Sequence, residues 1–344
     1  MTAPGDSGAL VSDAVAGLGP HGEFAASVDQ LHVSQEDAER ARALNFTVAT
    51  VLHTTTSDWS KQQIAGIRAT LDGYGARLTE VFDCDFRTDR QVEVLAELAQ
   101  QRPDAVISIP VHNVLTAEAH RAVADAGIKL VLMDNAPIGL IARKHYVTVV
   151  SADNFGNGQI GAILLSPYIP SAGVVGIVGF GVDFFVTNER EIAFRKWMSE
   201  HRPDVRIRRE EFADIHAAGD VAERLALGAP PVDGLFVAWD VPAMAVVHAL
   251  RSLRRSVPMT TVDLGIDAAT ELARNGLVKG IAAQRPYDLG VAEATAAIMA
   301  LVGDEPPPWI ALPGFPVTRE NVIDAYESVY HAPAPELLRT ETAR

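Results

Sequence analysis

Polar and aromatic side chains recur directly after short apolar runs of this sequence. Carboxylates, amides and hydroxyls can exchange hydrogen bonds with ligand hydroxyl groups, and flat aromatic rings pack on ligand C–H faces. The pattern therefore favours a neutral, polyhydroxylated ligand. The alternative is that each aspartate caps a following helix and each aromatic ring belongs to the core. The candidate binding residues are Ser57, Asp58, Trp59, Asp134, Asn135, Phe184, Phe185, Arg190, Trp239, Asp240, Asp263 and Gln284.

Arg190 is the most informative of these candidates. With Thr187 as N-cap, Arg190 falls in the first turn of its expected helix, where the helix dipole disfavours a cation. A carboxylate or a ligand at this point would offset that cost. The alternative is an exposed arginine whose stem packs on the surface.

No set of residues supports catalysis or metal binding. Gly156, Gly158 and Gly161 match G-x-G-x-x-G, but five residues separate them from the preceding strand, so the tight phosphate-binding turn is missing. We expect Asp153 or Asn154 to cap a helix there, with small residues for close packing. The ten histidines show no metal-site spacing. We therefore expect no enzyme activity, no cofactor and no metal.

The candidates are positioned by a regular alternation of short β-branched runs and amphipathic stretches. Two successive β-α-β series of about five strands each predict two α/β lobes with parallel sheets. Because the carboxyl ends of parallel strands share one edge of a sheet, ligands bind beyond that edge. The predicted strands are 46–52, 77–82, 105–109, 129–133 and 147–150, then 174–178, 205–208, 235–238, 260–262 and 280–283.

Composition excludes several classes of protein. The 344 residues carry 29 Lys and Arg against 44 Asp and Glu, a net charge of −15, which disfavours nucleic acid and anionic membranes as partners. Cys84 is the one cysteine, so no disulfide framework forms within the chain. No run of 18 apolar residues predicts a membrane span. The first Lys or Arg is Arg40, so the sequence shows no positively charged start of a secretory signal.

Several motifs together resemble the periplasmic sugar-binding proteins of the ribose-binding type, whose fold is shared with lac-repressor-like effector domains. They are SDW at 57–59, VLMDN at 131–135, VVSADNFGNG at 149–158, DFFVTNEREIAF at 183–194, LFVAWDVPAMAV at 235–246 and GIAAQRPYDLG at 280–290. The resemblance covers about residues 46–332. It implies the type I periplasmic binding protein fold, with two Rossmann-like lobes joined by a three-strand hinge. Its closest likeness is to solute-binding proteins of ABC importers for pentoses and small polyols.

The resemblance also implies roles for single residues. Ser57 and Trp59 match a ligand-binding pair, and Arg190, Asp263 and Gln284 match polar ligand contacts. Asn135 stands where ribose binders place an arginine, and Trp239 where they place an asparagine. These differences disfavour ribose and favour a smaller or more reduced ligand, such as a tetritol or a pentitol. The aromatic stack on the ligand is expected from Trp59 and from Phe184 or Phe185.

The expected organisation is a flexible leader with a short helix at 1–45 and a tail at 333–344. One lobe takes 46–151 and 285–311, and the other takes 152–284 and 312–332. By resemblance we expect a monomer outside the cytoplasm, in the periplasm or at the cell surface, that meets ABC permease subunits. Two alternatives stay open, which are a cytoplasmic ligand-sensing module and a sugar-processing oxidoreductase.

Overall fold

The N-terminal lobe (N-lobe) is built on a six-stranded sheet in the order β11-β5-β4-β3-β1-β2, in which all neighbours are parallel. The computed structural model describes residues 14–343. Most of the strands read as nearly continuous apolar runs because both faces of the sheet are buried there, whereas the edge strand β2 is polar and at least partly exposed along its length. The strands are β1 (Thr47–Leu52), β2 (Arg77–Asp83), β3 (Ala105–Ser108), β4 (Lys129–Met133), β5 (Val149–Ala152) and β11 (Trp309–Leu312).

The C-terminal lobe (C-lobe) repeats this plan in the order β12-β10-β9-β8-β6-β7. All of its neighbours are parallel except β12, which pairs antiparallel with β10. The strands are β6 (Val174–Phe180), β7 (Arg206–Phe212), β8 (Gly234–Val237), β9 (Met259–Val262), β10 (Val278–Ala283) and β12 (Phe315–Val317).

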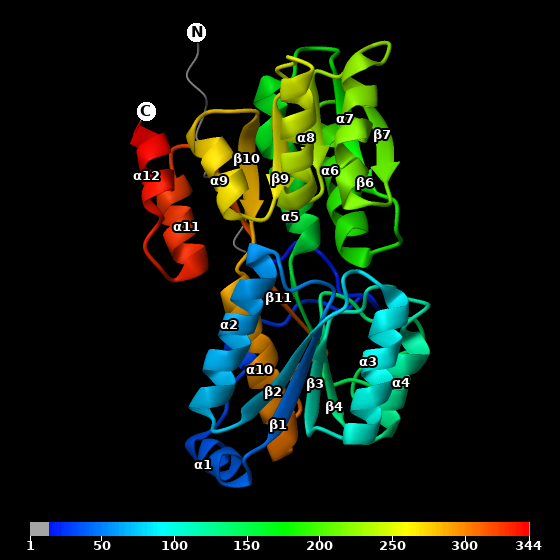
Figure 1. The fold of residues 1–344 in the computed structure, drawn as a ribbon, viewed down its shortest axis with the longest axis vertical. Helices are drawn as coiled ribbons and strands as arrows, with labels where there is room; N and C mark the ends of the chain where they lie inside the picture. The colour runs from blue at the N-terminus through cyan, green and yellow to red at the C-terminus, as the bar shows by residue number, and fades with distance from the viewer. Residues whose placement is uncertain (1–13, 344) are drawn as a thin grey trace.

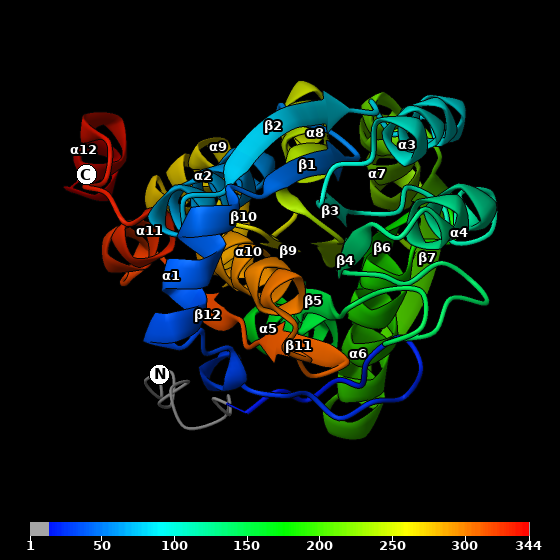
Figure 2. The same ribbon diagram turned by 90° about the horizontal axis from the view of Figure 1, so that it is seen from below.

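Helices cover both faces of each sheet, and Figure 2 shows α2 and α10 on one side of the N-lobe sheet with α3 and α4 on the other. In the C-lobe, α5 and α6 pack together, as do α7 and α8. The helices are α1 (Gln35–Leu44), α2 (Asp58–Gly73), α3 (Thr88–Gln101), α4 (Ala117–Asp125), α5 (Asn154–Leu165), α6 (Phe185–His201), α7 (Ala218–Leu227), α8 (Asp240–Ser252), α9 (Ile266–Ala273), α10 (Pro286–Val302), α11 (Val322–Tyr330) and α12 (Glu336–Ala343). Within residues 14–343, short 3₁₀ turns lie at Val28–Gln30, Ser166–Tyr168 and Ile215–Ala217.

The chain passes between the two lobes three times, as Figure 1 shows at the narrow junction between them. The passages lie between β5 and α5, between β10 and α10, and between β11 and β12. Each lobe is therefore assembled from separate stretches of sequence. The predicted two-lobe α/β fold with parallel sheets and three connecting strands is confirmed.

Three expectations need correction. From residue 14 on, the expected flexible leader packs on the protein: Ala26 forms a bridge with Ile310, and Asp153 accepts hydrogen bonds from the Ala16 and Gly17 backbones. Residues 1–13 lie outside the described part. The expected tail forms α12, which packs on α9 and buries Leu338. Each sheet also gains a sixth strand, β11 or β12, which the sequence pattern missed.

Among residues 14–343, no helix has the length and apolar character needed to cross a bilayer. Cys84 is fully buried, and this burial raises the pKa of its thiol to about 12. The thiol therefore stays protonated and unreactive at neutral pH.

Candidate functional site

A cavity lies where the carboxyl ends of strands from both lobes face each other. Nine of the twelve candidate residues line it. It has a volume of about 70 Å³, room for roughly five water molecules at the ~10–15 Å³ that each requires. The lining residues are His53, Ser57, Trp59, Phe86, Ile109 and Asp134 of the N-lobe, Phe180, Phe184, Val186, Thr187, Arg190, Trp239, Asp240 and Asp263 of the C-lobe, and Gln284 at the passage into α10.

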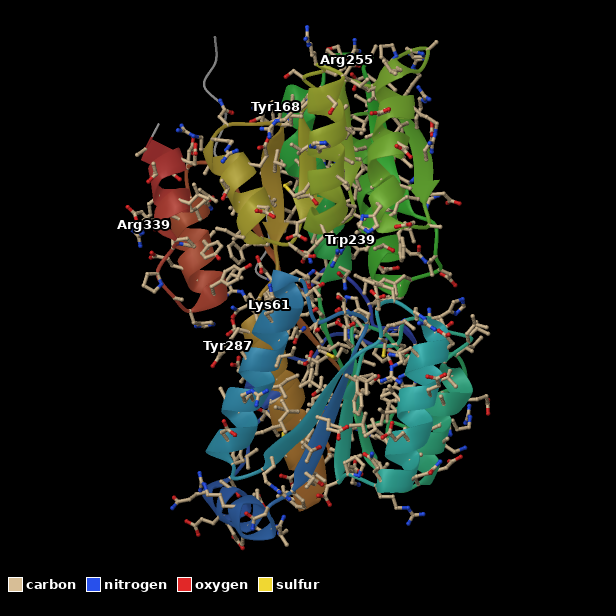
Figure 3. The ribbon with its side chains drawn as sticks, viewed as in Figure 1. Lys61, Tyr168, Trp239, Arg255, Tyr287 and Arg339 are labelled. Atoms are coloured by element: carbon tan, nitrogen blue, oxygen red, sulfur yellow. The ribbon has the colours of Figure 1, made fainter. Side chains whose placement is uncertain are left out.

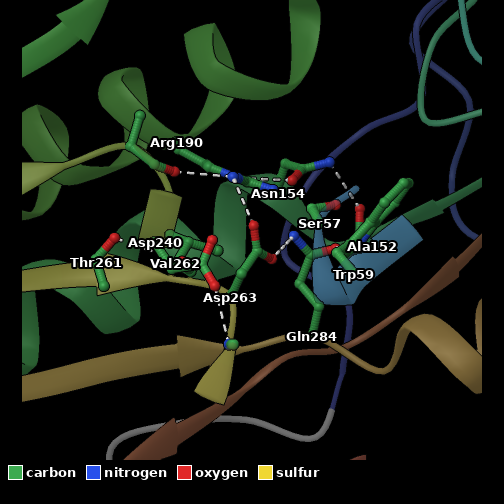
Figure 4. A network of polar contacts seen from close by, with 12 residues as sticks. Ser57, Trp59, Ala152, Asn154, Arg190, Asp240, Thr261, Val262, Asp263 and Gln284 are labelled. Carbon is green, nitrogen blue, oxygen red and sulfur yellow. Dashed lines mark hydrogen bonds and ion pairs between the residues drawn. The ribbon is translucent and has the colours of Figure 1, made fainter. Parts of the chain in front are cut away.

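A chain of polar contacts joins the two lobes across this cavity (Figure 4). The indole Nε1 of Trp59 donates to Oε1 of Gln284 at 3.3 Å, and Nε2 of Gln284 donates to Oδ1 of Asp263 at 2.5 Å. The other carboxylate oxygen of Asp263 lies 4.0 Å from Nη1 of Arg190. Gln284 is thus held between a ring of the N-lobe and a carboxylate of the C-lobe.

Arg190 is buried, with 3% of its surface exposed. Its Nε donates to Oδ1 of Asn154 at 3.0 Å, and its Nη1 donates to the backbone oxygen of Ala238 at 2.8 Å. The predicted helix start was wrong, because α6 begins at Phe185 and Thr187 bonds the Phe184 oxygen from inside the helix. Arg190 therefore lies in the second turn, and carboxylates offset the cost of burying its charge.

Two carboxylates occupy matching positions in the two lobes. Asp134 directly follows β4 and Asp263 directly follows β9. Both have left-handed backbones, with φ of 58° and 73°. Their N–H groups donate to Val150 and Ala282 on the neighbouring strand, at 2.8 and 3.1 Å. This turn ends the strand and leaves each aspartate at the edge that faces the other lobe.

The site contains more carboxylates than cations. Burial raises the pKa of Asp134 to about 6 and that of Asp240 to about 8, although Arg190 opposes the shift at Asp134. Burial also raises the pKa of Asp263, again against the effect of Arg190. Ligand hydroxyl groups that donate to these oxygens would replace the lost hydration.

Aromatic rings line the cavity from both lobes. In the N-lobe, His53 lies edge-on to Trp59 and to Phe86, with ring centroids 5.6 and 4.8 Å apart. In the C-lobe, Phe180 lies edge-on to Trp239 at 5.3 Å. Burial lowers the pKa of His53 to about 4, so its ring is neutral at pH 7.

The sequence interpretation missed six lining residues. His53 follows β1 and Phe180 ends β6, so the strand-end rule could have found both. Phe86 belongs to the loop after β2. The other three missed residues have apolar or small side chains, and nothing in their spacing distinguishes them from core residues. These three are Ile109, Val186 and Thr187.

Three candidates lie outside the cavity lining. Asn135 is buried and donates from Nδ2 to Oδ1 of Asn113. Phe185 is the half-buried first residue of α6. Asp58 bonds the C-lobe backbone at Ile266 and pairs with Lys61 at 3.2 Å.

The glycine motif has a packing role, as predicted. Asp153 caps α5 by accepting from the Gly156 N–H at 2.9 Å. A Cβ at Gly158 would lie 2.1 Å from the Arg190 backbone oxygen, and one at Gly161 would lie 2.6 Å from the Phe236 ring. These glycines therefore allow α5 to pack closely on its neighbours. Among residues 14–343, no group of three or more His, Cys, Asp or Glu is placed to hold a metal ion.

Asp240→Asn should remove a pH dependence from the stability of the ligand-free protein. Because the pKa of Asp240 rises to about 8 on folding, its contribution to stability is full below pH ~4 and is lost as the pH rises through 8. Asparagine keeps the acceptor for Gly265 but cannot ionise. The wild type should therefore lose stability relative to the variant as the pH rises. We expect the difference in Tm, variant minus wild type, to increase by several degrees from pH 5 to pH 9. Asp72→Asn, an exposed site on α2, is the control, and equal differences at both pH values would contradict the assignment.

The two lobes, each built on a mostly parallel sheet, and the polar cavity between them define a two-lobed ligand-binding protein. The chain belongs to the family described as periplasmic binding protein domain, whose family model matches residues 48–305. None of the curated protein sequences matches it significantly.

Solved structures share the fold at low identity. An ABC transporter solute-binding protein from Agrobacterium vitis, bound to α-D-tagatopyranose, is 22% identical with a TM-score of 0.77, covering 84% of this chain and 100% of its own. A carbohydrate transporter solute-binding protein from Agrobacterium radiobacter, in complex with D-arabinose, is 18% identical with a TM-score of 0.75, covering 84% and 99%. A second one from Agrobacterium vitis, with bound allitol, is 19% identical with a TM-score of 0.71, covering 82% and 98%.

Proposed function

We propose that this protein is the solute-binding component of an ABC importer and binds a small sugar or polyol between its lobes. One observation carries the proposal: buried carboxylates and aromatic rings of both lobes line a single cavity at the junction. Hydroxyl groups of a ligand would donate to Asp134, Asp240 and Asp263, while its C–H faces pack on Trp59 and Trp239.

The size of the cavity supports a monosaccharide or a short polyol. The cavity is small, at about 70 Å³, which favours a small ligand over an oligosaccharide. The relatives with tagatopyranose, arabinose and allitol hold ligands of this class. Trp239 fills part of the C-lobe side of the cavity, which favours a tetritol, a pentitol or a pentose.

The mechanism we propose is closure of the lobes around the ligand, without chemical conversion. The lobes would comprise 46–151 with 285–311, and 152–284 with 312–332, and would turn about the three passages of the chain. A ligand that contacts both lobes stabilises the closed form. A monomer outside the cytoplasm would then present this form to permease subunits in the membrane.

A thermal-shift screen tests the proposal. The panel contains pentoses, tetritols, pentitols, hexitols, inositols and tagatose, with NAD and ATP as controls. A ligand at 100 times its Kd stabilises the folded protein by about 2.7 kcal/mol, so the Tm should rise by several degrees with one sugar or polyol. A rise with a nucleotide alone, or with none of the compounds, would contradict the proposed function.

A further inference from the structure

Asp58 directs its side chain to the other lobe instead of into the cavity. It is the first residue of α2 in the N-lobe, and its Oδ2 accepts a hydrogen bond of 3.1 Å from the backbone N–H of Ile266 in the C-lobe. Ile266 is the first residue of α9, where backbone N–H groups lack partners within the helix. Figure 3 shows Lys61, one turn further along α2, close to this junction.

The C-lobe segment that receives Asp58 is fixed from its own side. The Gly265 N–H donates to Oδ2 of Asp240 at 2.9 Å, and the Tyr330 hydroxyl donates to the Leu264 oxygen at 2.9 Å. A Cβ at Gly265 would lie 2.4 Å from Oδ2 of Asp240, so the close approach requires glycine. The same segment, 263–266, begins with Asp263, a carboxylate of the ligand cavity.

The geometry points to Asp58 as a residue that stabilises the closed form of the two lobes. We call its hydrogen bond with the Ile266 N–H the latch. We propose that Asp58 is a positioning residue that holds the lobes together through the Ile266 N–H. Asp263, on the segment that it holds, and Asp240, which is bonded to that segment, face the ligand. This inference rests on the proposed function. When the lobes separate, this hydrogen bond breaks, so its energy belongs to the closed state only. A carboxylate at a helix N-terminus is a favourable acceptor because the bond is charge-assisted and the helix dipole adds to it.

A latch has a signature that differs from that of a ligand contact. If only a fraction of the molecules is closed, the apparent Kd equals the intrinsic Kd divided by that fraction. Loss of the latch lowers the closed fraction and therefore weakens all ligands by the same factor. Loss of a direct contact would instead weaken those ligands most that use the contact.

The test is Asp58→Ala, with Kd measured by calorimetry for the best and the second-best compound of the thermal-shift panel. We expect both Kd values to increase by the same factor, about tenfold or more, for the loss of one charge-assisted hydrogen bond. Asp58→Asn, which keeps an acceptor oxygen, should show a smaller increase. Lys61→Ala is the control and should leave both values unchanged, since Lys61 pairs with Oδ1 of Asp58, whereas the Ile266 N–H donates to Oδ2.

Unequal factors for the two ligands would overturn the latch and make Asp58 a ligand contact, and unchanged Kd values would overturn it as well. The unfolding temperature without ligand separates a folding defect from either result. If no compound binds wild type, the proposed function fails and small-angle scattering decides about the latch. A larger radius of gyration for Asp58→Ala than for wild type would then support the latch, and equal radii would overturn it.

Discussion

Arg190→Ala is expected to abolish ligand binding and to lower the stability of the protein by about 3–5 kcal/mol, the usual cost of leaving a buried charge without its partner. Among the described residues, Arg190 is the one Lys or Arg in the cavity lining, and its guanidinium faces Asp263 while it donates to Asn154 and Ala238. Without it, the pKa values of Asp263 and Asp134 would rise further, since Arg190 is the charge that opposes both shifts. Calorimetry with the compound found by thermal shift, together with the ligand-free Tm, measures both effects.

A double variant and a control variant separate the loss of the Arg190 charge from a general loss of stability. Arg190→Ala combined with Asp263→Asn should recover part of the stability, because the second change removes an uncompensated carboxylate, but binding should stay lost. Arg202→Ala is the matched control: Arg202 lies near the end of α6, where it pairs with Asp204 and bonds the Ser166 oxygen away from the cavity. It should leave the Kd unchanged. A Kd for Arg190→Ala within threefold of wild type would refute the central role of this residue.

The sequence predicted the lobes well because most of their strands are apolar runs that alternate with helices. It missed β11 and β12 because Trp309–Leu312 and Phe315–Val317 lie next to prolines and glycine and no helix separates them. Their strand identity comes from partners far away in the chain, since β11 pairs with β5 and β12 with β10. Local propensity carries no information about such pairings.

Adjacent residues at the site also separate in ways that spacing alone does not reveal. Asp58 and Trp59 are neighbours at the start of α2, but successive helical side chains point about 100° apart. One therefore reaches Ile266 and the other lines the cavity. The left-handed backbone at Asp134 likewise directs Asn135 toward Asn113.

The helix start at Arg190 was misplaced for a related reason. The N-cap of α6 is Phe184, which offers no side-chain acceptor, so the capping rule selected Thr187 instead. The aromatic ring at this position lines the cavity. The N-cap position of α6 thus holds an aromatic residue of the cavity, and no capping side chain marks the start of the helix in the sequence.

Gly66→Ala and Gly290→Ala should each destabilise the protein by several kcal/mol and weaken ligand binding. The two glycines lie where α2 crosses α10. A Cβ on Gly66 would lie 2.2 Å from the Tyr287 oxygen, and one on Gly290 would lie 2.3 Å from the Gln63 oxygen. Since the obstacle on each side is backbone, the helices themselves must move apart, which costs more than a side-chain rearrangement.

The effect on binding follows from what these two helices carry. Trp59 lies in the first turn of α2, and Gln284 lies two residues before α10, so a wider crossing would pull their hydrogen bond apart. Gly73→Ala is the matched control, because it lies at the end of the same helix with nothing within 4 Å of its Cβ. It should match wild type in Kd and match or exceed it in Tm, as alanine favours helix over glycine by roughly 1 kcal/mol. If Gly66→Ala and Gly73→Ala had the same Tm, the close crossing would not be what holds α2 in place.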